Sequence, residues 1–321
     1  MRSISEKYSG PINSLMAIAL TILIYYSSTH YMPWLGLFQI FPIATLFVSE
    51  GPVWTLLSAV VIGVTAVVLT STTQMVFTMV YLLPGALCLG IMIKHKADFF
   101  HEIIVTSLVF LAAGFVQTAI AEHITGQSLI ELIKENMLAN YDSFVKAMME
   151  RSGGVDIPGL EYKFSKGVDI ILTLLPGIAF LSSMVSVFFT SLLSHALLKA
   201  GGKDVEYYGL SNFEFPKKPA IAALVICALT PFLGRGESVL TAVLYNLTLV
   251  SVGIFFLNGF AYIDYMMKKR GRSLVRRIVT YILIIVFMVG AVFATIIGLV
   301  EAIFSIRDKE RQKEDSNEGP Y

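Results

Sequence analysis

Long stretches without a charged residue set the pattern of this chain. No Asp, Glu, Lys or Arg occurs in residues 238–263 or in residues 278–300. Residues 8–49 and 51–93 are also uncharged. A helix needs about 20 apolar residues to cross a hydrocarbon core of roughly 30 Å. The pattern therefore predicts an all-α protein, a polytopic transmembrane helical bundle.

Turn-forming and polar residues divide these runs into nine candidate spans. The candidates cover residues 11–26, 34–48, 53–70, 75–93, 103–121, 170–194, 220–232, 238–263 and 278–300. Nine crossings from a cytoplasmic N-terminus would leave the basic C-terminal tail outside, although Lys and Arg are enriched on the cytoplasmic side. Either one candidate is re-entrant, the short second and seventh being the best choices, or the tail is an exception. We therefore expect eight or nine spans.

A cluster of six basic residues without an acidic neighbour separates the last two candidates. It consists of Lys268, Lys269, Arg270, Arg272, Arg276 and Arg277. Such a cluster stays on the cytoplasmic side, and by alternation it places the N-terminus there as well. We expect the cluster to contact anionic lipid, with the docking of a protein partner as the alternative.

Composition agrees with a membrane protein. The chain is 55% hydrophobic and 15% charged, with a mean hydropathy of +0.72, whereas soluble proteins carry about 25% charged residues. The net charge of +1 gives no support for a nucleic-acid partner. Cys88 and Cys227 lie in apolar runs, where lone cysteines behave as small buried hydrophobes.

The longest polar interval, residues 122–166, separates the fifth and sixth candidates. Its apolar residues recur every three or four positions, which predicts one amphipathic helix. They are Ile130, Ile133, Met137, Tyr141, Phe144 and Met148. This helix either covers a pocket or lies on the lipid headgroups. Residues 152–159, with three glycines and a proline, are expected to be a flexible connection.

These boundaries predict four parts. Residues 1–10 form a cytoplasmic N-terminus, and residues 11–199 form a six-helix membrane core that includes the polar interval as an outer loop. Residues 200–305 contribute three further membrane segments. Residues 306–321 are polar and are expected to be a disordered tail.

Catalytic motifs have no support in the sequence. His101 and Glu102 begin like a zinc-protease helix, but Val105 stands where that motif needs its second histidine. There is neither a glycine-rich phosphate loop ending in Lys-Ser or Lys-Thr nor a Gly-x-Ser-x-Gly nucleophile. We therefore expect no enzyme activity, no metal site and no cofactor.

Polar residues near the ends of the outer spans are the candidate ligand site. Ionisable and amide groups at membrane depth are costly, so they usually face protein or water. The hypothesis is an outward-facing pocket for a small molecule lined by Trp34, Gln39, Gln74, Gln117, Glu122 and His123. The alternative is that the glutamines bond between helices and that Glu122 and His123 lie where a helix meets water.

A ridge of small residues marks the last candidate span. Gly290, Ala294 and Gly298 repeat every four positions, a spacing that lets two helix backbones approach closely in lipid. We interpret the ridge as a packing surface within the bundle, and a dimer seam is the alternative.

The C-terminal quarter resembles the YybS-like family of bacterial membrane proteins. The residues that carry the resemblance are the apolar stretch 255–262, the basic turn that follows it, and a closing Gly298-Leu299-Val300-Glu301 with Arg307 beyond. In the family pattern Asn258 stands where a glutamine is common and Glu301 where an aspartate is common. The resemblance implies a multi-pass protein of the bacterial inner membrane.

Residues 11–199 resemble the six-helix substrate-binding components of energy-coupling-factor transporters. Gly51-Pro52 closes a short second helix, and Pro84-Gly85 lies in a fourth helix that ends in lysines. The resemblance implies a small-metabolite site that opens outward and transport-coupling subunits as partners.

Two hypotheses of function follow. The first is a small-metabolite binding protein of transport type without ATP chemistry of its own. The second is a non-transporting membrane scaffold that recruits protein partners or anionic lipid through its basic cytoplasmic loops. A co-purifying small molecule with a coupling subunit favours the first, and a protein partner without a ligand favours the second.

Overall fold

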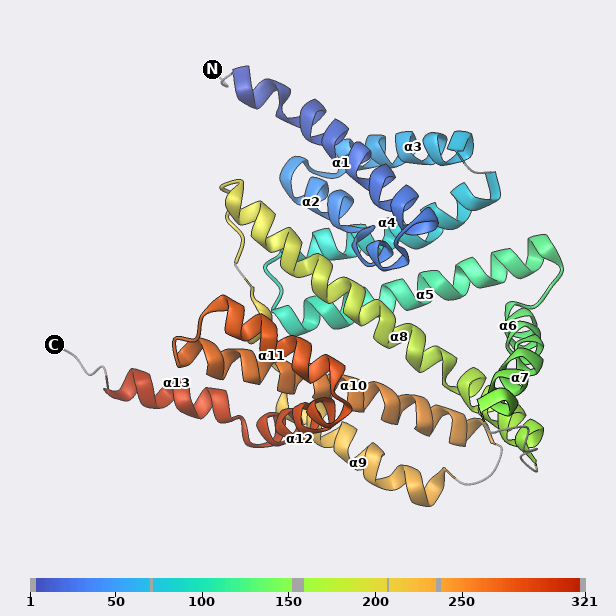
Figure 1. Ribbon diagram of the computed structural model, residues 1–321. Coiled ribbons are helices and arrows are strands. Elements are labelled where there is room, and N and C mark those ends of the chain that lie inside the picture. Colours follow the sequence, from blue (N-terminus) through green and yellow to red (C-terminus); the bar gives the residue numbers. More distant parts are fainter. Residues whose placement is uncertain (1–3, 70–71, 152–158, 207, 235–237, 318–321) are drawn as a thin grey trace.

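Every regular element in the described part of the chain is a helix. The computed structural model describes residues 4–69, 72–151, 159–206, 208–234 and 238–317 (Figure 1). The predicted all-α membrane bundle is confirmed. Five described helices or helix pairs are long and apolar enough to cross a membrane, or six if one bent pair is counted as a span. The expected number of eight to nine spans is not confirmed.

The N-terminal unit contains five α-helices and a short 3₁₀ helix. They are α1 (Ile4–His30), η1 (Pro33–Phe38), α2 (Phe41–Glu50), α3 (Pro52–Leu69), α4 (Thr72–Lys94) and α5 (Phe99–Thr125). Helix α1 packs on α2 and α3, and α4 packs on α5. The second expected span is a broken segment, Pro33–Glu50, in which η1 ends at Phe38 and α2 begins at Phe41. Pro42 near the start of α2 lacks the backbone N–H that a continuous helix would use across this break.

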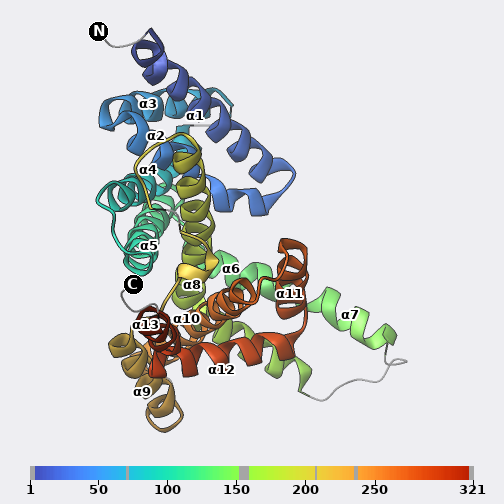
Figure 2. The same cartoon turned by 90° about the vertical axis from the view of Figure 1, so that its left-hand side faces the viewer.

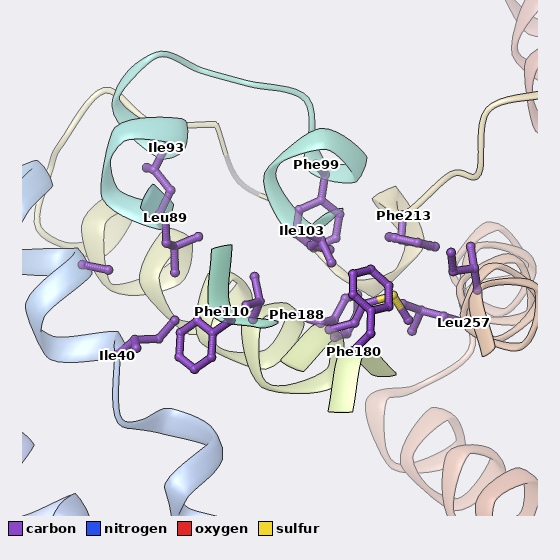
Figure 3. Close-up of a cluster of buried hydrophobic side chains, with 14 of the residues drawn as sticks. Ile40, Leu89, Ile93, Phe99, Ile103, Phe110, Phe180, Phe188, Phe213 and Leu257 are labelled. Carbon is purple, nitrogen blue, oxygen red and sulfur yellow. The ribbon is translucent and has the colours of Figure 1, made fainter. Parts of the chain in front are cut away.

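The long helix α8 (Leu160–Ala200) joins this unit to the C-terminal one. It contacts α2 and α5 on one side and α10 (Val239–Lys269) on the other (Figures 1 and 2). The buried side chains of Phe110, Phe188 and Phe213 belong to one continuous apolar cluster that spans both units (Figure 3). The two units therefore share a single core with α8 at its centre.

Helix α8 also carries a stripe of buried polar residues. They are Ser183, Ser186, Thr190, Ser191, Ser194 and His195. Nearer its start, α8 contains Pro176, and the side-chain amide of Asn246 on α10 bridges the turn around this proline. Its Oδ1 accepts from the N–H of Gly177 at 2.7 Å, and its Nδ2 donates to the carbonyl of Thr173 at 2.8 Å. The amide thus satisfies backbone groups that a kinked helix exposes in lipid.

Helices α10 and α12 (Met288–Phe304) make the closest crossing in the C-terminal unit. A methyl group on Gly298 would lie 1.9 Å from the carbonyl oxygen of Phe255, and one on Gly259 would lie 1.7 Å from that of Ala294. The structure therefore places Ala294 and Gly298 against α10. Gly290 lies instead beside Ile284, at the bend between α11 (Leu274–Val286) and α12.

The last expected span is not one helix. Helices α11 and α12 are bent by 104° at Phe287, which corrects the expectation of a straight span over residues 278–300. Lys269 at the end of α10 pairs with Glu310 of α13 (Ile306–Asn317) at 3.0 Å. The bend therefore returns the chain to the side of the bundle on which α10 ends. The basic tail therefore lies on the same face as the basic cluster.

Two further expectations differ from the structure. The amphipathic segment is divided into α6 (Leu129–Ala139) and α7 (Tyr141–Arg151), because Asn140 caps α6 and its Nδ2 donates back to the carbonyl of Asn136. The start of the C-terminal tail is helical as α13. Most of the connection expected at residues 152–159 lies outside the described residues.

The α10–α12 crossing gives a direct test of the packing. We expect Gly298→Ala to separate the helices and to destabilise the protein by about 1–3 kcal/mol, the usual cost of overpacking. Gly167→Ala in α8 is the matched control, since nothing lies within 4 Å of the added methyl. Thermal unfolding in detergent measures both variants, and equal melting temperatures would contradict the crossing.

Candidate functional site

A polar cavity of about 460 Å³ lies where the two units meet. Its walls come from the start of α5, the segment that joins α8 to α9 (Lys217–Leu233), the end of α12 and the start of α13. Five acidic residues line it, namely Asp98, Glu206, Glu214, Glu301 and Asp308, together with the basic Lys217 and Arg311. Phe99, Phe100, Tyr208 and Phe215 supply aromatic surface.

A buried Glu–His pair lies behind one wall of the cavity. Glu102 in the first turn of α5 is fully buried, and so is Ser191 of α8. His195 Nε2 lies 3.0 Å from Glu102 Oε2, and Ser191 donates to Glu102 Oε1. The positive end of the α5 dipole favours a carboxylate at this position. Sequence reasoning considered Glu102 only within the rejected protease motif.

The segment after α8 connects this pair to the cavity. His195 Nδ1 lies 2.6 Å from the carbonyl oxygen of Glu206, and the rings of His195 and Tyr208 are 4.8 Å apart. The Tyr208 hydroxyl donates to the Glu206 carboxylate at 2.6 Å. Burial, together with that hydrogen bond, raises the pKa of the Tyr208 hydroxyl. Tyr208 therefore stays a hydrogen-bond donor to Glu206.

A fully buried arginine organises the opposite wall. Arg307 Nε donates to Glu301 Oε1 at 2.8 Å and Nη2 donates to Asn258 Oδ1 at 2.8 Å. Its Nη1 donates to the carbonyl oxygens of Ser211 and Phe213. Asn258 Nδ2 closes the network with a 2.6 Å bond to Glu301 Oε2. One side chain thus ties three helices to the segment that lines the cavity.

The basic cluster is only partly available to lipid or partners. Arg277 Nη2 pairs at 2.6 Å with the buried Asp264, and Lys268 lies 3.3 Å from the same carboxylate. Lys269 pairs with Glu310 of α13. The other three members, Arg270, Arg272 and Arg276, are exposed.

Five of the six expected pocket residues have described side chains, and none of these five lines either cavity described here. Trp34 in η1 is 58% exposed, and Gln39 donates to Ser28 Oγ at 3.1 Å. Gln117 is half-buried on α5, and His123 is exposed in the last turn of that helix. Glu122 Oε1 accepts from the N–H of Leu129 at 3.0 Å and so caps α6. The side chain of Gln74 lies outside the described residues.

A second cavity, of about 770 Å³, is mostly apolar. It lies between α1, α2 and the end of α8, and Leu20, Phe41 and Leu197 are among its lining residues. Asn13, Ser49 and Lys203 make its mouth polar. Lys203 Nζ already donates to the carbonyl oxygen of Ser49 at 3.0 Å.

The fold and these buried ionisable groups define a polytopic α-helical membrane protein. Residues 17–301 match the family described as "Predicted membrane protein (DUF2232)", and the chain belongs to that family. The YybS-like resemblance is thereby confirmed. No curated protein and no solved structure matches the chain. The resemblance of residues 11–199 to energy-coupling-factor components stays a prediction, as does the orientation in a bacterial inner membrane.

The Arg307 network predicts an unequal effect of two arginine substitutions. Arg307→Met leaves the Glu301 carboxylate buried without its cation, and we expect a loss of about 3–5 kcal/mol in the free energy of unfolding. Arg311→Met removes an exposed partner of Glu214 and a cation–π contact with the Tyr265 ring, and because both are at the surface we expect a loss of about 1 kcal/mol or less.

Unfolding of the detergent-solubilised protein measures both substitutions. The double variant Arg307→Met with Glu301→Gln should recover part of the loss, because the introduced amide is uncharged and its oxygen can still accept from Asn258 Nδ2. A double variant less stable than Arg307→Met alone would contradict the buried ion pair.

Proposed function

We propose that this protein binds a small organic cation in the polar cavity and acts as a solute-binding protein of transport type. The observation that carries the proposal is the acidic surplus of the cavity, whose lining contains five carboxylates against two basic side chains. A volume of about 460 Å³ falls in the usual range for small-molecule sites, roughly 300–1,000 Å³.

Two of these carboxylates have no basic side chain at ion-pair distance among the described residues. Glu301 pairs with Arg307, Glu214 pairs with Arg311, and Asp98 contacts the ring of His101. Glu206 accepts the Tyr208 hydroxyl, but neither it nor Asp308 has a basic side chain within 4.0 Å in the described part of the chain. A ligand with one or two ammonium groups would supply the missing charge, and the aromatic walls suit its carbon skeleton.

The chemistry of the lining favours an organic cation over a metal ion. Among the described residues, no group of three or more His, Cys, Asp or Glu side chains is placed to hold a metal. Carboxylates spread over a cavity instead suit a ligand whose charges are separated by a carbon chain.

A role in transport is supported by the buried ionisable groups. Glu102, Asp264 and Glu301 are buried near the ends of apolar helices, and buried ionisable residues in membrane proteins commonly mark solute or proton pathways. The resemblance to energy-coupling-factor components points the same way and suggests that coupling subunits supply the energy. With the basic face in the cytoplasm, the cavity opens inward, unlike the outward pocket that the sequence suggested.

Binding of a diamine tests this proposal. We expect hexamethylenediamine, measured by calorimetry on the detergent-solubilised full chain, to bind, and the uncharged hexanediol of the same length not to bind. Glu206→Gln and Asp308→Asn should each weaken binding about tenfold, the value of one charged hydrogen bond.

Asp204→Asn is the matched control for these substitutions. Asp204 lies in the same segment but pairs with Lys96 at 2.7 Å and does not line the cavity. Equal binding of the diol, or unchanged binding in both cavity variants, would contradict the proposal.

The exposed arginines favour a second role. Arg270, Arg272 and Arg276 stand on the basic face without an acidic partner among the described residues, and three such charges attract anionic lipid or an acidic protein surface. Native mass spectrometry discriminates the two roles, since a scaffold should retain a protein partner and no small molecule.

A further inference from the structure

The two ring nitrogens of His195 face different kinds of partner. Nδ1 lies 2.6 Å from the carbonyl oxygen of Glu206, and a carbonyl can only accept a hydrogen bond. Nδ1 therefore carries a hydrogen. If the imidazole is neutral, Nε2 then has a lone pair directed at Glu102.

The 3.0 Å contact between Nε2 and Glu102 Oε2 consequently requires one more proton. It belongs either to an imidazolium that faces a carboxylate or to a carboxylic acid that donates to a neutral ring. In both cases the pair has no net charge. Without this proton, a lone pair would face a carboxylate in a site that is almost fully closed to water, since Glu102 is 0% and His195 2% exposed.

The same ring holds the wall of the cavity. Its Nδ1–H anchors the backbone at Glu206, and Tyr208 packs edge-on against it at 4.8 Å. Glu206 and Tyr208 both line the cavity. Any rotation of the imidazole that relieves the repulsion after proton loss also breaks the bond to this wall.

The other titratable groups near the pair lie on the cavity side or at the surface. Tyr208 and Glu206 stand between the pair and the cavity, and Asp98 at the start of α5 binds His101. Lys96, which follows the end of α4, pairs with Asp204. Glu206 and Tyr208 are therefore the groups that join the buried pair to the cavity.

The geometry points to a proton site at Glu102–His195 that is linked to cation binding in the cavity, so that the protein exchanges one proton for one bound organic cation. The inference rests on the proposed function. The proton leaves the Nε2–Oε2 contact for water, and the pair becomes negatively charged. That charge favours a cation in the adjoining cavity, and by linkage a bound cation favours loss of the proton.

Proton release on ligand binding tests the link. When hexamethylenediamine is added to weakly buffered, solubilised protein, a pH-indicator dye should report about one proton per bound diamine. The affinity should rise with pH by up to about tenfold per pH unit. Below about pH 10 the diamine itself stays charged, because alkyl ammonium groups lose their protons only near that pH.

Glu102→Gln is the informative variant. Its amide N–H can donate to His195 Nε2, and its amide oxygen can accept from Ser191, so it mimics the protonated pair without a removable proton. We expect it to bind the diamine without releasing a proton. His123→Gln, which removes an exposed histidine at the far end of α5, is the matched control and should release the proton as the wild type does.

A second measurement needs no ligand. Hydrogen–deuterium exchange of residues 203–209, corrected for the intrinsic rate, should accelerate at least about tenfold between about pH 6 and about pH 9 in the wild type. The Glu102→Gln variant should show no such change. Equal pH dependence in the two proteins would overturn the proton site.

The outcomes separate the two proposals. If the diamine does not bind, the proposed function is wrong, and the hydrogen–deuterium exchange experiment still tests the proton site. Binding without proton release in the wild type leaves the cation site standing and overturns the link.

Discussion

A charge buried in a helical bundle surrounded by lipid must be neutralised within the protein, because neither hydrocarbon nor bulk water can do so. Glu102, Asp264 and Glu301 meet this requirement through His195, Arg277 and Arg307 respectively. Each pair joins two different helices, namely α5 with α8, α10 with α11, and α12 with α13. The elements around the cavity are therefore held in register by polar contacts as well as by apolar packing, which is weakly directional in lipid.

Helix α8 makes apolar contacts with some neighbours and polar contacts with others. Phe180, Met184 and Phe188 contribute to the core that both units share. Ser191 and His195 contact Glu102 of α5, whereas Ser186 and Thr190 donate to the carbonyl oxygen of Leu37 in η1. Nearer the start of α8, Asn246 of α10 satisfies backbone groups on both sides of Pro176. A helix of 41 residues thus serves as a support for two units without being apolar throughout.

The cavity belongs to neither unit alone. Its acidic side chains come from α5, from the segment after α8 and from α12 and α13, so any change in how the units meet alters its shape. The Arg307 network fixes one wall, and the Glu102–His195 pair fixes the other. A site built in this way can respond to protonation because its wall is bonded to a titratable group rather than to a permanent charge.

The hydrophobic pattern by itself determined the membrane class and the approximate positions of most apolar helices, because spans in lipid are specified by local composition. The YybS-like ending was identified by its resemblance to the family and not by that pattern. The Ser/Thr/His repeat from Ser183 to His195 was a readable signal of a polar face, but its partners were not. Only the tertiary structure decided that Glu102 meets His195, that Arg307 is buried and that the last apolar run bends at Phe287. Those contacts join residues up to 96 positions apart, and no periodicity encodes which distant groups will share a buried site.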